Sequence, residues 1–141
     1  MNPFLNAIAS YLDSLDVGIF DTDSGRNIFV NVLPPDPNEC IALLGLPGDA
    51  LDDSRDVAEM QFPRFQAFVR SDDSDDGFTL FQSVRESLHG KLNLKLPSST
   101  PPYWRILRMH VDQEGGPIGQ DDQGRYEFSV NFTTQAHFVS E

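Results

Sequence analysis

The clearest pattern in the sequence is an alternation of apolar and polar residues near its C-terminal end, over residues 126–136. Successive side chains of a β-strand point to opposite faces of a sheet, so this pattern predicts a long strand with one apolar and one polar face. The apolar face carries Tyr126, Phe128, Val130, Phe132, Thr134 and Ala136, and the polar face carries Glu127, Ser129, Asn131, Thr133 and Gln135.

Shorter strands are predicted at residues 28–33, 39–46, 62–70, 92–96 and 103–111, because these stretches are apolar or alternating and are bounded by turn-forming residues. In residues 62–70 one face is apolar and the other is mostly polar. The polar face of that strand carries Arg64, Gln66, Phe68 and Arg70.

Two segments carry apolar residues at helical spacing. The first, residues 3–16, begins at the favourable pair Asn2-Pro3 and ends before Gly18, which offers a left-handed stop. The second follows the acidic run at residues 72–76, whose carboxylates are suited to cap a helix. Its expected apolar stripe is Phe78, Phe81, Val84 and Leu88.

The order of these elements predicts an α+β fold with a mixed, mainly antiparallel β-sheet flanked by two amphipathic helices. The helices are expected to cover the apolar face of the sheet. A single domain over residues 1–141 fits the length of the chain. Two polar, turn-rich segments are expected at the surface, a mobile acidic loop at residues 47–60 and a long turn at residues 112–124.

Charge and cysteine content narrow the function classes. The chain has 22 acidic residues against 10 Lys and Arg, a net charge of −12. This balance argues against a DNA phosphate-binding surface and against an anionic membrane. Apolar stretches fall far short of the ~20 residues that span a bilayer, and no signal pattern opens the chain, so we expect a soluble protein that is not exported by that route. Cys40 lies in an apolar run, which predicts a core residue in a protein that folds in a reduced cytosol.

No motif supports catalysis or a cofactor. Residues 72–77 partly match a calcium loop, but Ser83 stands where a bidentate glutamate is needed, so we interpret the run as a helix cap. The three histidines are dispersed, and no serine or cysteine has a nucleophile context. We therefore predict no catalytic, cofactor or metal site, and no enzyme. Tyr103 and Trp104 fit a binding hot spot and a buried strand start equally well.

Three segments resemble the phage minor capsid and tail terminator family. Residues 4–12 with Gly18 resemble its first helix, and residues 33–43 resemble its proline turn into an apolar strand. Residues 124–132, preceded by Ile118 and Gly119, resemble its closing strand. Residues 65–70 and 84–90 fit the strand and helix between them. The segments 47–60 and 97–102 are longer than the family pattern, which affects partner contacts rather than the fold.

The resemblance implies a structural virion protein, assembled in the host cytoplasm, that forms a hexameric ring. Such a ring caps the tail tube and joins it to the head–tail connector or stopper protein in the neck. The implied partners are further copies of the chain, the tail tube protein and the connector. Genomic DNA would pass through without specific binding, as expected for walls of like charge.

The polar strand faces are the candidate interface or lumen-facing surface, although an ordinary solvent-facing side of an antiparallel sheet gives the same pattern. A head-side connector or stopper ring is an alternative function, and an acidic inhibitor that imitates DNA is another. The inhibitor would need carboxylates arrayed along one surface, whereas many lie in residues 49–56, 72–76 and 112–122. Native mass separates a six-copy ring from a small inhibitor. The candidate residues are Glu127, Ser129, Asn131, Thr133, Gln135, Arg64, Gln66 and Arg70.

Overall fold

The computed structural model describes residues 3–47 and 60–139. Its elements, in chain order, are α1 (Pro3–Ser14), β1 (Ile28–Val30), β2 (Cys40–Leu46), β3 (Arg64–Ser71), α2 (Ser74–Leu88), β4 (Lys91–Leu96), β5 (Tyr103–Val111), β6 (Gly116–Gln120) and β7 (Tyr126–Val139). The predicted acidic loop at residues 47–60 falls almost wholly outside the described residues.

The strands form one sheet in the order β1-β2-β3-β7-β5-β4. Only the β1–β2 pair is parallel, and the other pairs are antiparallel. Strands β5 and β6 share one edge of β7: β5 pairs with residues 132–139 and β6 with residues 126–129. The predicted α+β fold with a mixed, mainly antiparallel sheet is therefore confirmed.

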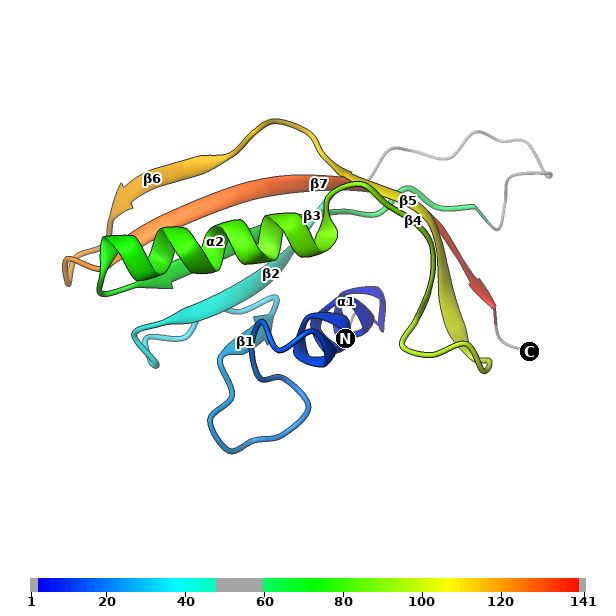
Figure 1. The fold of residues 1–141 in the computed structure, drawn as a ribbon, viewed down its shortest axis with the longest axis horizontal. Coiled ribbons are helices and arrows are strands. Elements are labelled where there is room, and N and C mark those ends of the chain that lie inside the picture. Colours follow the sequence, from blue (N-terminus) through cyan, green and yellow to red (C-terminus); the bar gives the residue numbers. More distant parts are fainter. Residues whose placement is uncertain (1–2, 48–59, 140–141) are drawn as a thin grey trace.

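Both helices pack on the same face of the sheet, which we call the helix-covered face. Figure 1 shows α2 lying along β3 and β7, with α1 beside β1 and β2 and reaching toward β4. Aromatic rings join the layers: Phe4 of α1 meets Trp104 edge-on at 5.2 Å, and Phe81 of α2 stacks on Phe128 at 5.7 Å between ring centroids. Trp104 is only 8% exposed, which decides in favour of the core interpretation of this residue.

The register confirms the predicted alternation of β7. Phe128, Val130 and Phe132 are buried and lie opposite Val69, Ala67 and Phe65 of β3. Directly opposed residues share a face, so these six side chains form the centre of the core under the helices. The polar residues of β7 from Glu127 to Gln135 are half-buried on the other face, which we call the helix-free face.

Several local predictions were wrong. The left-handed residue after α1 is Asp16, with φ 61°, and not Gly18; the Val17 N–H then donates to the Leu12 carbonyl and closes the helix. Gly18 is needed for another reason, because a Cβ there would lie 2.7 Å from Ile28 Cγ1. β1 is shorter than predicted, since Asn31 also has a positive φ of 59°.

The three remaining differences concern faces and turns. Phe78 is 44% exposed, and Gly77 rather than Phe78 begins the buried stripe of α2. The helix packs so closely there that a Cβ at Gly77 would lie 2.7 Å from Phe128 Cε1. Leu92 is 66% exposed rather than in line with Leu96, because a positive φ at Asn93 interrupts the alternation. The predicted long turn at residues 112–124 contains β6.

Candidate interaction surface

The candidate residues of β3 and β7 meet on the helix-free face. The β3–β7 register sets Gln66 opposite Asn131, Arg64 opposite Thr133, and Phe68 opposite Ser129. Because both strands alternate, these side chains form adjacent rows on one face of the sheet. The polar surface predicted from two separate strands is thus continuous in the fold.

Part of this face is a groove of about 470 Å³. Arg64, Gln66, Ser129 and Asn131 line one side of it, and the connection from β5 into β6, residues 112–118, lines the other. The groove offers amide and hydroxyl groups to a partner, with carbonyl and N–H groups of the connection nearby. It is a polar groove rather than an apolar pocket.

The charges in the groove are paired within the chain. Arg64 Nη2 lies 2.9 Å from Asp112 Oδ2, and the Thr133 hydroxyl donates to the other carboxylate oxygen of Asp112. Burial alone would raise the pKa of Asp112, but the hydrogen bonds from Thr133 and Arg64 outweigh it and hold that pKa below its usual value. Asp112 was missed by sequence reasoning, because it is 48 residues from Arg64 and no local pattern marks it.

Arg70 does not belong to the accessible surface, which corrects the prediction for this residue. It is 3% exposed, and its Nη2 donates to the carbonyls of Pro34 and Pro37, each at 2.7 Å. Arg125 holds the same segment by donating from Nη1 to the Pro35 carbonyl at 2.6 Å. The two guanidinium groups therefore fasten the 34–38 segment over this end of the helix-free face.

The acidic run before α2 is a helix cap, as predicted. Asp73 is the N-cap residue, and its carboxylate accepts from the Asp75 N–H at 3.0 Å. Within residues 3–47 and 60–139, His, Cys, Asp and Glu form no group of three or more that could hold a metal ion. Cys40 is fully buried, which confirms its core position, and burial raises the pKa of its thiol.

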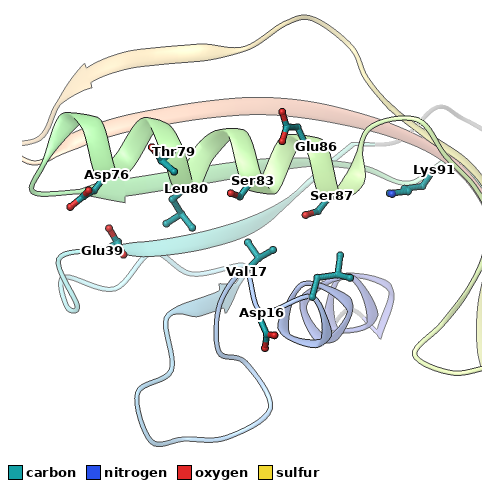
Figure 2. Close-up of a pocket in the computed structure, with 11 residues that line it drawn as sticks. Asp16, Val17, Glu39, Asp76, Thr79, Leu80, Ser83, Glu86, Ser87 and Lys91 are labelled. Atoms are coloured by element: carbon teal, nitrogen blue, oxygen red, sulfur yellow. The ribbon is translucent and has the colours of Figure 1, made fainter.

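A second groove, of about 730 Å³, lies on the helix-covered side between α2 and the segment that follows α1. Figure 2 shows Glu39, from the residue before β2, and Asp76 of α2 pointing toward one another near one end. Asp16 and Glu86 also line the groove, with their carboxylates directed away from the space between α2 and the segment after α1, and Lys91 lies at the far end. We call this surface the acidic groove.

None of the helices in the described part of the chain is long and apolar enough to cross a membrane.

Comparison with known proteins shows which family and which solved structure the chain is similar to. A family model described as "Bacteriophage tail terminator protein" matches residues 11–138. A chain of the solved structure titled "Virion of native gene transfer agent (GTA) particle" is similar with a TM-score of 0.62 and 15% identity, over 93% of this chain and 92% of that chain. At that identity the likeness concerns the fold alone. No curated protein matches the chain.

Proposed function

The chain belongs to the bacteriophage tail terminator family, and we propose that six copies of it form a ring that caps the tail tube and joins it to the head–tail connector. In this role it is a structural component of the virion and not an enzyme. Its partners are its own copies, the tail tube protein on one side, and the connector or stopper protein on the other.

The observation that carries the proposal is the helix-free face. A seven-stranded sheet with helices on only one side leaves a broad second face. Here the part of that face along β7 is regular, polar and hollowed by the groove at Gln66 and Asn131, while the 34–38 segment covers one end, where Arg70 is buried. A polar sheet face of this kind is better suited to a protein interface or to the wall of a water-filled channel than to burial in a core. Within the described residues, outer strand β4 also leaves a sheet edge available to neighbours, whereas the edge of β1 is partly occupied by the hydrogen bond from the Ile28 N–H to the Ile19 carbonyl.

Ring closure by rotation requires heterologous contacts, in which one surface of a copy meets a different surface of the next. The candidate residues for these contacts, or for the lumen, are Gln66, Ser129, Asn131 and Gln135, with Arg64 and Thr133 held in place by Asp112. Glu127 contributes at the end covered by the 34–38 segment. A net charge of −12 favours passage of DNA without retention.

Electron microscopy of the assembled particle tests the proposal. We expect density for this chain as a six-fold ring at the head-proximal end of the tail tube. Density on the head side of the neck would instead indicate a connector or stopper ring. Absence of the chain from the particle, or a symmetry other than six-fold, would refute the proposal.

A further inference from the structure

Positive charge is concentrated in one part of this acidic chain. Residues 87–111 contain four of the ten Lys and Arg residues and none of the 22 Asp and Glu residues. These residues form the β4–β5 hairpin, which projects at one end of the sheet (Figure 1). The rest of the chain therefore carries all of the negative charge and only the six remaining cations.

Three of the cations in this segment form a strip on the helix-free face. Lys95 lies directly opposite Arg105 in the β4–β5 register, and Arg105 lies opposite His137 of β7. Arg108 lies opposite Gln135, on the same face as the polar residues of β7. We call Lys95, Arg105 and Arg108 the basic strip.

The basic strip is open to a partner. All three side chains are exposed, and none of them forms an ion pair among residues 3–47 and 60–139. Like charges directly opposite each other on neighbouring strands destabilise a sheet, so the Lys95–Arg105 pair is unfavourable in an isolated copy. Next to Arg108 lies Leu92, 66% exposed, which adds an apolar contact to the strip. An anionic partner would relieve the repulsion and cover this leucine.

The chain itself supplies a suitable anionic partner. The acidic groove, which Glu39 and Asp76 line, lies on the helix-covered side of the sheet, whereas the strand register places the basic strip on the helix-free face. Two copies of so acidic a protein repel each other in most orientations. A two-fold contact that paired strip with groove would have to pair both surfaces of each copy at once, which surfaces on opposite sides of one sheet cannot do. Head-to-tail contact therefore brings the opposite charges together.

We propose that the basic strip of one copy docks on the acidic groove of the next, and that this contact sets the head-to-tail orientation of the subunits. The inference rests on the proposed ring and adds the surfaces that meet in it. Charge complementarity favours a second copy over DNA as the occupant, because the strip contains only three cations within a strongly anionic molecule.

Zero-length cross-linking tests the contact directly. A carbodiimide joins a lysine amine to a carboxylate only when the two groups touch. In a mixture of isotopically light and heavy full-length protein, we expect light–heavy links from Lys95 to Glu39 or Asp76. Screening is weak at about 10 mM salt, where the Debye length is about 30 Å, and we expect the links to be lost at about 1 M, where it is about 3 Å.

Charge reversal in two separate variants provides the matched control. Arg105→Glu/Arg108→Glu makes both surfaces acidic, and Glu39→Lys/Asp76→Lys makes both basic. Sedimentation velocity should show each variant alone associating about tenfold more weakly than the wild type. An equimolar mixture should recover association, because the reversed strip of one variant then matches the reversed groove of the other. Circular dichroism verifies that both variants are folded.

Three outcomes of these solution experiments would overturn the inference. The first is that both variants associate as strongly as the wild type, or that their equimolar mixture does not recover association. The second is a wild type that gives no light–heavy links at about 1 mM chain, a concentration that detects contacts of millimolar Kd. The third is a strip variant that loses binding to duplex DNA but associates normally, which would assign the strip to DNA. A six-fold ring with other contact surfaces would refute only this inference, whereas absence of the chain from the particle would refute the proposed function itself.

Discussion

Truncation of Phe132 to alanine tests the central claim about β7, that adjacent residues of this strand have opposite roles. Phe132 is fully buried on the helix-covered face and stacks on Phe65 with ring centroids 5.1 Å apart. Its neighbour Asn131 is half-buried on the helix-free face and lines the polar groove. Asn131→Ala is therefore the matched control, one residue away on the same strand.

The size of the effect follows from burial. Removing a buried phenylalanine ring typically costs about 3–5 kcal/mol, because the transfer free energy is lost and a cavity remains. The stacked contact with Phe65 places Phe132→Ala in the middle of this range, at about 4 kcal/mol, which corresponds to a fall in Tm of about 13 °C for a chain of this length. Asn131→Ala should change the free energy of unfolding by less than about 1 kcal/mol.

Urea unfolding provides the measurement, because the chain has a single tryptophan, Trp104, and it lies in the same core. Its fluorescence should report one transition whose midpoint falls strongly in Phe132→Ala and hardly moves in Asn131→Ala. If the two variants lose equal stability, the assignment of the two faces of β7 is wrong.

Three further predictions concern single side chains. Arg70→Ala should lower the free energy of unfolding by about 3 kcal/mol, because the buried guanidinium and its hydrogen bonds to the Pro34 and Pro37 carbonyls are lost, whereas exposed Arg108→Ala should change it by less than about 0.5 kcal/mol; equal thermal shifts would contradict the burial of Arg70. The pKa of Asp112 lies below its usual value in the folded protein, so its contribution is present above about pH 4 and is lost as the pH falls through the folded pKa. Asp112→Asn should therefore destabilise the protein at neutral pH and converge with the wild type in acid, and a constant difference across the pH range would argue against the paired carboxylate. Asp73→Ala should cost about 1 kcal/mol through loss of the α2 cap, and calorimetric titration should give no calcium site tighter than the millimolar range in either protein; a micromolar site that disappears in the variant would restore the calcium-loop interpretation.

Much of the fold was predictable because its signals are local. The alternation over residues 126–136 fixes which side chains of β7 share a face, and this required no knowledge of neighbouring strands. Likewise, the carboxylates before Ser74 begin α2 through hydrogen bonds to the next few N–H groups, as the Asp73 cap shows. Errors arose where one backbone angle changed the pattern, at Asp16, Asn31 and Asn93.

The candidate interaction surface depended on contacts between distant segments. Arg70 looked like a polar surface residue from its strand alone, and only tertiary structure brings the Pro34 and Pro37 carbonyls, 36 and 33 residues earlier, to its guanidinium. Asp112 joins Arg64 and Thr133 in the same way.

The sequence by itself determined the strand and helix types, the two faces of β7 and the amounts of charge, because side-chain spacing and composition are properties of the chain. Only the tertiary structure decided that the acidic groove and the basic strip lie on opposite sides of one sheet, since strand order and register set which residues become neighbours.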